Sequence, residues 1–464
     1  MKLQIQNYFK NLKNILKKIN FLELYSLPNL FKIDLRNDKL FFYNSLKKKI
    51  FRKKYAIVNP EKFSKSEVIF ISHYLGSIKN QKKDFYYGGL FDYLKKKNIN
   101  VSVILLNKTN YLPSKIVEKY VNSNIGIAVV DNYYNPLSSF YIFLYIVYIY
   151  IKFKFKKRTT YFNKKEKKIL QEKFKFTNFL FSRNTIQLYL NIKKIIDLAI
   201  PNLKKIIITY EGHSFEKLII SYCNKKNINT IGYFFSVIRD FDNSIFYSMG
   251  SNTNPRSLWV TGQNIKKYFI KKLKTVKTKK NIEVIGYSRQ IRKNKKISKN
   301  SKVILFCPEG LYSETLNMFR FASTLKKNFP YLRIIFRTHP EIKSFFIRKL
   351  SDMDSNIKIS KNKLDKDLEN ASILVYRGSS LCINAIYASI LPVYLNLKDK
   401  INLDPLFQVS KSKFRVNNPK EFIEIFKFLS NKKKLNNYLI DLKKYTNLYF
   451  ENFNYNKIYK ILKK

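Results

Sequence analysis

Short apolar runs that end in polar turns recur along this chain, and they constrain its fold more than any other feature. Val68–Ile71 and Val101–Leu106 are two such runs, and a helical pattern over Leu90–Lys97 separates them. Continuous apolar runs of this length are typical of parallel strands that are buried on both faces. Strand, helix and strand in this order predict a βαβ unit, so the sequence indicates an α/β fold.

The same pattern continues to the far end of the chain. Further strand candidates are Ile206–Tyr210, Thr230–Phe234, Leu258–Gly262, Ile282–Gly286, Val303–Phe306, Leu332–Phe336, Ile373–Tyr376 and Leu391–Leu395. A chain of 464 residues exceeds one ordinary core, which predicts two domains of roughly 200 residues each.

We therefore expect two Rossmann-like α/β domains that face a central cleft. The Lys-rich segment 266–280 is the expected boundary between them. The expected division is a basic N-terminal extension (1–65), an N-terminal domain (66–265), a C-terminal domain (281–440) and a C-terminal helix (441–464).

The chain is strongly basic. Lys and Arg outnumber Asp and Glu by 90 to 31, which gives a formal net charge of +59. The basic residues are spread along the whole chain, so compositional bias is the first interpretation and attraction to an anionic membrane surface is the second. Nucleic acid is the least favoured partner because no zinc-finger, RNP-like or basic-zipper signature is found.

The cysteines and the N-terminus both point to the cytoplasm. Cys223, Cys307 and Cys382 are too few and too scattered for a disulfide framework or a Cys-based metal site. Each lies in or beside an apolar run, so we expect buried free thiols in a reducing compartment. The N-terminus has no uninterrupted apolar core, so it does not resemble a signal peptide.

One stretch in the N-terminal half leaves two interpretations open. Leu137–Ile151 contains almost no polar residues, and a basic cluster over 152–158 follows it. The stretch is shorter than the roughly 20 residues that span a bilayer. It therefore predicts either a buried helix or a helix that lies in a membrane interface.

A His-Pro pair follows one of the strand candidates in the second half. Leu332–Phe336 leads directly into Arg337, and His339 and Pro340 come two residues later. Pro340 helps to fix the turn. An imidazole at the sheet edge can donate a hydrogen bond to a phosphate or protonate it as it leaves, and Arg337 could pair with its oxygens. A structural histidine is the alternative.

A Gly-Ser-Ser turn follows another strand candidate. Ile373–Tyr376 opens into Arg377, Gly378, Ser379 and Ser380, and a helical pattern comes next. Glycine permits a close backbone approach, and hydroxyl and free amide groups at a helix start favour an anion. Because open α/β sheets bind ligands at the carboxyl ends of their strands, these four residues are candidate nucleotide ligands. A purely structural helix cap is the alternative.

An acidic residue follows a strand candidate in the first half. Glu211 is followed there by Gly212 and His213. A carboxylate in this place can remove the proton from an acceptor hydroxyl, although a surface acid near a helix start is the alternative. Glu216 is expected to be a helix-face charge, and His73 and His213 are loop histidines that could join the site. We predict no metal site, because the spacing of these residues matches no metal motif.

Together these elements resemble the GT-B glycosyltransferases. The acidic-Gly element at Glu211, the His-Pro at His339 and the Ser-Ser at Ser379 resemble those of bacterial sialyltransferases and Kdo transferases, which use cytidine-monophosphate sugars. Two positions depart from those patterns. Tyr210 stands where the sialyltransferase element has a second acidic residue, and Asn384 stands where many GT-B enzymes have a ribose-binding Glu.

The run Thr209–Glu216 also resembles a group of surface-carbohydrate biosynthesis proteins. That likeness continues through Ile231–Tyr233 and into the His-Pro and Gly-Ser-Ser region, over roughly residues 65–410. Its motifs are short, so it is moderately specific.

The resemblance implies a metal-independent glycosyltransferase without a cofactor. It would move a sugar from a nucleotide-sugar donor, CMP-linked in the sialyltransferase comparison, to a growing surface glycan or a lipid-linked acceptor. By this resemblance Glu211 is the base, His339, Ser379 and Ser380 hold the nucleotide phosphate, and the N-terminal domain binds the acceptor. The implied location is the cytoplasm, with peripheral association to the inner membrane.

Three alternatives stay open. The first is a glycerophosphotransferase that uses CDP-glycerol, since that family also pairs a His-Pro with a Ser-Ser. The second is a nucleotide-sugar epimerase of the same architecture, for which Glu309, Glu314 and His213 could supply acid–base groups. The third is a non-enzymatic protein of the same fold that binds a membrane or another polyanion.

Overall fold

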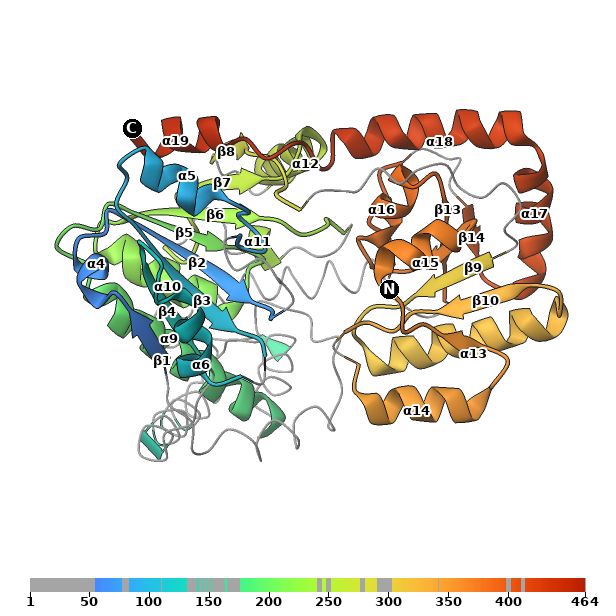
Figure 1. Ribbon diagram of the computed structural model, residues 1–464, viewed down its shortest axis with the longest axis horizontal. Helices are drawn as coiled ribbons and strands as arrows, with labels where there is room; N and C mark the ends of the chain where they lie inside the picture. Colours follow the sequence, from blue (N-terminus) through green and yellow to red (C-terminus); the bar gives the residue numbers. More distant parts are fainter. Residues whose placement is uncertain are drawn as a thin grey trace. The chain divides into compact units, whose positions relative to one another are not determined.

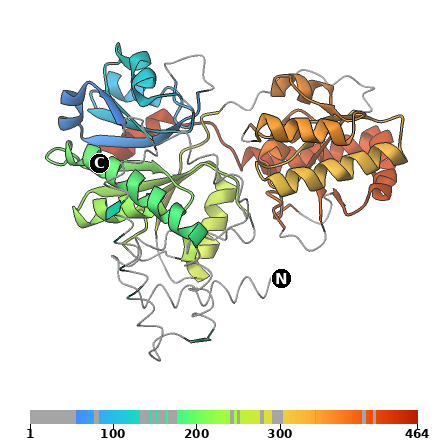
Figure 2. The ribbon, with the colours of Figure 1, turned by 90° about the horizontal axis from the view of Figure 1, so that it is seen from below.

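The computed structural model divides into two compact units, each with a parallel sheet and helices on both faces (Figures 1 and 2). Unit 1 comprises the chain as far as Phe235, Asn243–Arg289 and Glu451–Lys464, and unit 2 comprises Ser236–Asp242 and Gln290–Phe450. The two Rossmann-like α/β domains are thereby confirmed. The structure describes residues 55–76, 83–109, 111–131, 140–141, 144, 148, 151, 163–164, 176–239, 244–247, 252–275, 280–289, 303–340, 342–397, 402–409 and 414–463.

Unit 1 is built on a sheet that has eight strands within the described residues. All neighbouring strands are parallel except the edge pair β1 and β4, which is antiparallel. In spatial order the strands are β1 (Tyr55–Val58), β4 (Gly126–Val130), β3 (Val101–Asn107), β2 (Val68–Tyr74), β5 (Lys205–Thr209), β6 (Asn229–Phe234), β7 (Ser257–Val260) and β8 (Asn281–Val284).

Strand β2 shows why the apolar runs form this sheet. Val68 and Phe70 contribute to a core cluster with residues of two helices, α5 (Leu90–Lys96) and α19 (Tyr455–Lys463). Ile69 and Ile71 alternate with them on the other face and are also fully buried. Because both faces are covered, the strand needs apolar side chains at every position, and each contributes about 1.5–3 kcal/mol on burial.

The helices of unit 1 connect successive parallel strands, as a βαβ arrangement requires. In α10, buried Leu218, Ile219 and Cys223 recur at helical spacing. The other helices are α4 (Pro60–Ser64), α6 (Pro113–Val117), the 3₁₀ turn η2 (Glu118–Tyr120), α9 (Phe176–Asp197), α11 (Ser244–Tyr247) and α12 (Gln263–Thr275), and α10 itself spans Ser214–Lys225.

Unit 2 contains a second sheet, whose six described strands are all parallel. Phe306 and Phe336 on adjacent strands stack with ring centroids 6.3 Å apart inside its core. In spatial order the strands are β11 (Lys358–Ile359), β10 (Arg333–Phe336), β9 (Val303–Cys307), β12 (Ile373–Tyr376), β13 (Leu391–Leu395) and β14 (Phe414–Val416).

Amphipathic helices cover this second sheet. Met318, Phe319, Ala322 and Leu325 of α13 are buried in the same cluster as residues of β9 and β10. The helices of unit 2 are α13 (Tyr312–Asn328), α14 (Ser344–Met353), α15 (Leu364–Asn370), α16 (Leu381–Tyr387), the 3₁₀ turn η3 (Pro419–Glu421), α17 (Phe422–Ser430) and α18 (Lys432–Asn447).

Both sheets reverse their direction of winding in the middle. In unit 1 the chain adds β3 and β4 on one side of β2 and then returns to place β5 on the other side. In unit 2 it adds β10 and β11 on one side of β9 and then places β12 on the other. Such switch points are where open α/β sheets bind ligands, so β2/β5 and β9/β12 are the places to look for a site.

The observed division differs from the expected boundary. Strand β8 was expected to open the second domain, but it pairs in parallel with β7 and completes the first sheet. The Lys-rich segment before it is largely α12, whose buried Ile265, Phe269 and Leu273 recur at helical spacing. Its lysines therefore lie on the solvent face of an amphipathic helix, and where the structure describes it the segment is not a linker.

The expected extension and C-terminal helix also differ from the structure. Strand β1 and α4 fall within the expected extension 1–65 but belong to unit 1, and α19 returns from the C-terminus to the same unit. Strand β2 runs on through Tyr74, so His73 lies within a strand instead of in a loop. These segments join by pairing and packing with distant parts of the chain, which their local composition does not reveal.

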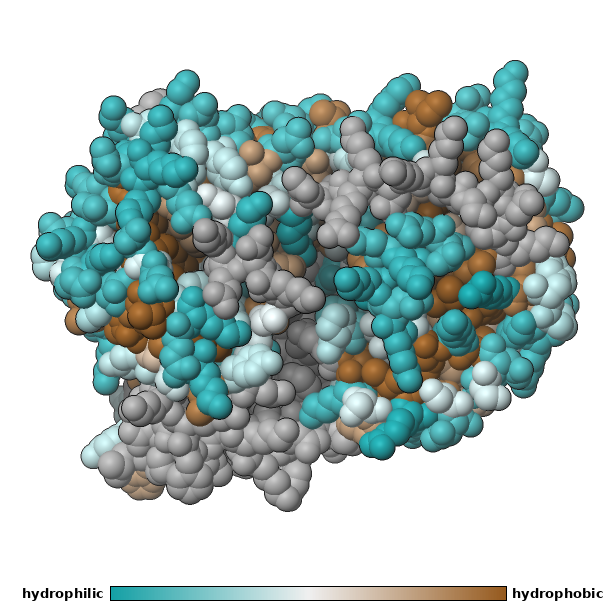
Figure 3. All heavy atoms as spheres, viewed as in Figure 1, coloured by the Kyte–Doolittle hydropathy of each residue, from teal (hydrophilic) through white to brown (hydrophobic). Residues whose placement is uncertain are grey.

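Several other expectations concern the surface and the thiols. The view in Figure 3 is mostly hydrophilic, as the excess of Lys and Arg would suggest. The three cysteines are buried free thiols, as predicted. Within the described residues, no helix combines the length and the hydrophobicity needed to cross a bilayer. Residues 1–54 and most of Leu137–Ile151 lie outside the described residues.

Candidate functional site

Glu211 and His213 form a hydrogen-bonded pair at the switch point of unit 1. Both follow β5 directly, and the Nε2 atom of His213 lies 3.1 Å from Oε2 of Glu211. Each side chain is about one-third exposed, at 29% for His213 and 34% for Glu211. A carboxylate and an imidazole at hydrogen-bond distance, both reachable from solvent, form a pair that can take up and release a proton.

A third residue, Glu216, fixes the backbone of this pair. Its Oε2 accepts the backbone N–H groups of Glu211, at 3.0 Å, and of His213, at 2.8 Å. The intervening Gly212 has a φ of +80°, a conformation that favours glycine. Glu216 was expected to be a helix-face charge, but it is buried, and burial raises its pKa to about 7. Its role is to hold the turn that presents Glu211.

His73 reaches the same place from β2. Its Nδ1 lies 3.4 Å from Oγ1 of Thr209, the last residue of β5. The pKa of His73 is lowered to about 3, mainly by burial and also by the positive charges of Lys108 and His213, while Glu211 opposes the change. His73 therefore stays neutral at physiological pH, and it is a hydrogen-bonding neighbour of the Glu211–His213 pair.

An aromatic cluster borders these groups. The ring of Tyr86 lies 5.7 Å from that of His73 and 4.3 Å from that of Phe235. The guanidinium of Arg289 lies 4.6 Å from the ring centroid of Phe85 and 5.8 Å from that of Tyr86. Burial raises the pKa of Tyr86, and the negative charge of Glu211 contributes to that rise. The acid–base pair thus has apolar, flat surfaces beside it.

In unit 2 the predicted residues follow three adjacent strands. Arg337 and His339 follow β10, Glu309 follows β9, and Gly378 and Ser379 follow β12. Strand β9 lies between the other two, so about 10 Å of sheet separates the end of the His-Pro strand from the end of the Gly-Ser-Ser strand. His339 and Pro340 are both exposed. The carbonyl of His339 accepts the backbone N–H of Ile342 at 2.9 Å.

Arg337 is engaged in an ion pair with a buried carboxylate. Its Nη1 donates to Oδ2 of Asp367 at 2.7 Å and to the carbonyl of Asn362 at 2.8 Å. Asp367 is fully buried and also accepts a hydrogen bond from Ser360 at 2.6 Å. These contacts stabilise the loop after β10, so the predicted phosphate contact of Arg337 competes with an existing partner.

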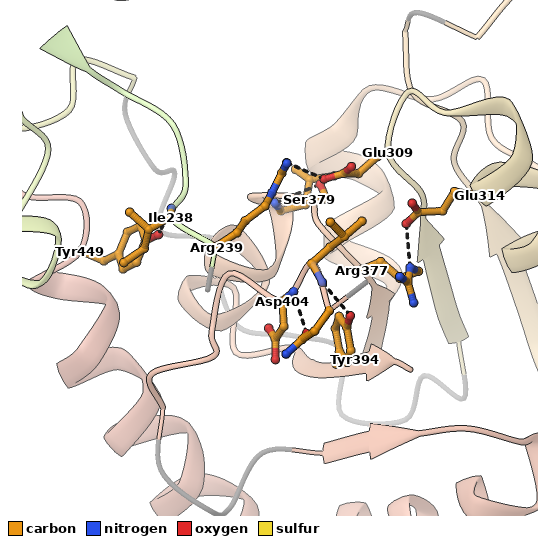
Figure 4. Close-up of polar contacts among 12 residues, drawn as sticks. Ile238, Arg239, Glu309, Glu314, Arg377, Ser379, Tyr394, Asp404 and Tyr449 are labelled. Atoms are coloured by element: carbon orange, nitrogen blue, oxygen red, sulfur yellow. Dashed lines mark hydrogen bonds and ion pairs between the residues drawn. The ribbon is translucent and has the colours of Figure 1, made fainter. Parts of the chain in front are cut away.

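The side chain of Arg377 is more deeply buried than that of Arg337. It is 2% exposed, its Nε donates to Oε1 of Glu314 at 3.0 Å, and its Nη1 donates to the carbonyl of Leu395 at 2.9 Å (Figure 4). The pKa of Glu314 is raised to about 7, mainly by burial and also by the negative charge of Glu309, while Arg377 opposes the rise. The predicted direct phosphate contact of Arg377 does not match this placement, because the side chain points into the unit toward Glu314.

The Gly-Ser-Ser turn is crowded by a carboxylate. A Cβ atom placed on Gly378 would lie 1.8 Å from Oε1 of Glu309, so only glycine allows Glu309 its position. Ser379 Oγ accepts the backbone N–H of Leu381 at 3.3 Å, a local turn before α16, whereas the N-cap residue Ser380 makes no side-chain cap hydrogen bond. Ser379 and Ser380 are both partly exposed, so their hydroxyls stay accessible to a ligand.

Arg239 completes the unit 2 site. It comes from the connector Ser236–Asp242, and its Nη2 donates to Oε1 of Glu309 at 2.8 Å (Figure 4). The preceding residue, Ile238, is buried, and its backbone N–H donates to the hydroxyl of Tyr449 at 2.7 Å. Sequence reasoning missed Arg239 because its connector carries neither a strand pattern nor a motif.

The positioning role of Glu216, which sequence reasoning missed, had a detectable signal in the sequence. His213 and Glu216 stand at the helix start and three residues later, which is the spacing of a capping box, although His is an unusual member of it. Arg239 had no such signal. The structure thus brings Glu211, Gly212 and His213 together in unit 1, and it places Glu309, Gly378 and Ser379 together in unit 2.

Comparisons with known proteins support the fold. No family model matches the chain, and neither does any curated protein. Among solved structures, UDP-GlcNAc 2-epimerase from Methanocaldococcus jannaschii in complex with UDP-GlcNAc and UDP is similar at 14% identity. The match covers 85% of this chain and 99% of that one, with a TM-score of 0.50.

Two looser matches have similar coverage. UDP-GlcNAc 2-epimerase from Neisseria meningitidis matches at 12% identity over 85% of this chain and 98% of that one, with a TM-score of 0.48. A glycosyltransferase from Rickettsia africae matches at 13% identity over 86% and 99%, with a TM-score of 0.42. At these identities the likeness is one of fold, and the two-domain α/β architecture is the GT-B-like one of the Methanocaldococcus jannaschii epimerase.

Proposed function

We propose that this protein is an enzyme of nucleotide-sugar chemistry and that it transfers a glycosyl group. The observation that carries the proposal is the Glu211–His213 pair, 3.1 Å apart, at the switch point of unit 1. Polar groups at a switch point of a doubly wound sheet are placed to meet a ligand. The fold is shared with a solved epimerase whose structure holds UDP-GlcNAc and UDP, which supports a nucleotide sugar as the substrate class.

In this proposal Glu211 is the general base. Its carboxylate would accept the proton of an acceptor hydroxyl while the sugar–phosphate bond breaks. His213, when its Nε2 carries a proton, donates to Oε2 of Glu211 and holds that carboxylate in one orientation. Glu216 acts as a positioning residue through the backbone N–H groups of Glu211 and His213.

Unit 2 would hold the nucleotide. We propose that His339 and the hydroxyls of Ser379 and Ser380 donate hydrogen bonds to the phosphate of the donor. We assign no direct phosphate contact to Arg337 or Arg377, whose guanidinium groups bind Asp367 and Glu314. The donor is a nucleotide sugar, and a cytidine-linked one is the candidate that the sequence motifs favour.

Nucleotide binding tests this proposal directly. The thermal unfolding midpoint of the protein would be measured with CMP, CDP, UDP and GDP, at moderate and at high salt, because a chain of charge +59 attracts any polyanion. A selective shift that persists at high salt and is lost in His339→Ala supports the proposal. Equal shifts with all four that vanish at high salt would contradict it and favour a non-enzymatic polyanion-binding protein.

Epimerisation of a nucleotide sugar is a second candidate function. The observation that favours it is Glu314, a carboxyl whose pKa is raised to about 7 and which can therefore exchange a proton near neutral pH. Product analysis separates the two reactions. A transferase needs an acceptor and produces a glycoside, whereas an epimerase converts the sugar without any acceptor. A CDP-selective shift followed by turnover of CDP-glycerol would identify the glycerophosphotransferase alternative instead.

We also propose that the acceptor is presented at an anionic membrane surface. Phe140, Leu144, Tyr148 and Ile151 are helical and exposed, and their spacing of three and four residues is that of one face of a helix. The basic cluster over 152–158 follows in the sequence, and the chain as a whole is strongly positive. Co-sedimentation with vesicles that contain phosphatidylglycerol, and not with neutral vesicles, is expected. Loss of binding in Phe140→Ser/Leu144→Ser would locate the contact.

A further inference from the structure

We propose that Arg239 is a phosphate ligand of the nucleotide and that the carboxylate of Glu309 occupies the phosphate position until the substrate displaces it. This inference rests on the proposed function and adds a residue and a binding step to it. The Arg239–Glu309 ion pair would thus act as an internal substitute for the enzyme–phosphate contact.

The ion pair has the geometry that such an exchange needs. Nη2 of Arg239 donates to Oε1 of Glu309 at 2.8 Å, and the side chains are 21% and 15% exposed. A phosphate can therefore reach the guanidinium from solvent. A phosphate can accept two parallel N–H bonds from a guanidinium, whereas the Glu309 carboxylate accepts one from Nη2, so a phosphate can compete with Glu309 for Arg239.

The second observation that supports the inference is the position of the Glu309 carboxylate. Oε1 of Glu309 lies so close to the backbone of Gly378 that a Cβ atom there would come within 1.8 Å of it. Gly378 does not have a positive φ, so its backbone conformation alone would admit other residues. The glycine therefore serves to let an anionic oxygen approach the main chain at the end of β12, next to Ser379 (Figure 4).

The surrounding structure fixes Arg239 before any ligand binds. Val237 and Ile238 are buried, and the N–H of Ile238 donates to the hydroxyl of Tyr449, which is itself buried. A side chain on an anchored backbone loses little freedom when it binds, which favours a role as a ligand. Arg337 and Arg377, by contrast, bind carboxylates that are 0% and 9% exposed, against 15% for Glu309, so their partners are harder to displace.

The test is a double-mutant cycle on binding. Affinities of inorganic pyrophosphate, CDP, UDP and uridine would be measured by calorimetry for the wild type, Glu309→Gln, Arg239→Gln and the double variant. Arg239→Gln should weaken pyrophosphate and the preferred diphosphate by about tenfold or more. Glu309→Gln should tighten them by about two- to fivefold, because no carboxylate has to be displaced. Uridine, which has no phosphate, should be unaffected.

Glu424→Gln is the matched control. It makes the same change of charge in the same unit, in an exposed pair with Lys427. If Glu309→Gln tightens binding no more than Glu424→Gln does, the inference is overturned while the proposed function stands. If Glu309→Gln raises the affinity equally or more in the Arg239→Gln background, the inference is also overturned. Such a result would mean that Glu309 merely repels the phosphate, which requires no arginine. If the wild type binds no nucleotide selectively, the proposed function fails and the inference fails with it.

Discussion

The switch points of the two units have the same topology and carry a glutamate each, but they pair it differently. In unit 1, Glu211 follows β5 and pairs with a histidine two residues along the chain. In unit 2, Glu309 follows β9 and pairs with an arginine 70 residues away. Histidine changes its charge near neutral pH and arginine does not. The first pair is therefore suited to moving a proton, and the second is suited to binding an anion.

The two glutamates are also held differently. The backbone of Glu211 is fixed by Glu216, a buried carboxylate that accepts two N–H groups, so the side chain of Glu211 remains available to a substrate. Glu309 instead has its own side chain positioned, by Arg239 on one side and by the backbone of Gly378 on the other. The same fold can thus present a carboxylate as a reactant or as a removable partner, depending on which atoms are held.

Glu211→Gln should give the largest effect, because it removes the base and keeps the shape. We expect turnover to fall by about 10²–10⁴-fold, while the affinity for the nucleotide product stays at the wild-type value. Steady-state kinetics and calorimetry on the same preparation measure both quantities. Glu61→Gln, on an exposed residue of α4 in the same unit, is the control. Wild-type turnover in Glu211→Gln would remove the distinction between the two switch points.

Arg377→Met should cause the next largest effect, on stability. It leaves Glu314 buried without its guanidinium partner, which costs about 3–5 kcal/mol in the free energy of unfolding. The loss should be smaller below pH 7, because Glu314, whose pKa is already raised to about 7, can then bind a proton. Denaturant unfolding at two pH values measures this, and Arg333→Met on an exposed residue of β10 is the control. Equal losses for both variants would refute the structural role of Arg377.

Gly378→Ala tests the close approach of Glu309 to the backbone. The added methyl meets Oε1 of Glu309, so we expect a loss of about 1–3 kcal/mol in the free energy of unfolding. Glu309→Ala in the same chain should recover most of that loss. Gly89→Ala is the control, since its methyl would lie 3.8 Å from the nearest atom, the Tyr455 hydroxyl. Failure of Glu309→Ala to relieve the Gly378→Ala variant would mean that another atom requires the glycine.

The smallest effect concerns the pH dependence of unit 1. The pKa of His73 is lowered from 6.5 to about 3, so its neutral form is favoured in the fold. Stability from His73 is therefore present above pH 6.5 and is lost as the pH falls toward 3. Between pH 7 and pH 5 we expect the wild type to lose about 1–2 kcal/mol more than His73→Gln.

The pH dependence of stability has to be compared between the wild type and His73→Gln, because Glu216 changes the stability with pH in the opposite direction. Its pKa is raised from 4.5 to about 7, so its contribution to stability is lost as the pH rises through 7. Glu216 is present in both proteins, and its contribution cancels in the difference. Identical pH profiles for the wild type and His73→Gln would show that His73 titrates as it does in the unfolded chain.

The sequence by itself determined most of the strands, although not β1, β4, β11 or β14. Apolar runs such as Val303–Phe306 and Leu391–Leu395 predict strands because a strand covered on both faces needs apolar residues at every position, and that requirement is local. The Glu211–His213 pair was accessible to sequence reasoning for a similar reason. Its members lie within one turn at the end of one strand.

The tertiary structure alone decided the order of the strands and the contacts that depend on it. Strand β8 completes the first sheet although a basic segment precedes it. That segment is largely the amphipathic helix α12, whose buried apolar face a count of its lysines does not reveal. Arg377 meets Glu314 across 63 residues, and Arg239 meets Glu309 across 70. Hydrophobic periodicity specifies which face of an element is buried, whereas the neighbours of that element come from long-range packing, and ion pairs between distant segments follow from those neighbours.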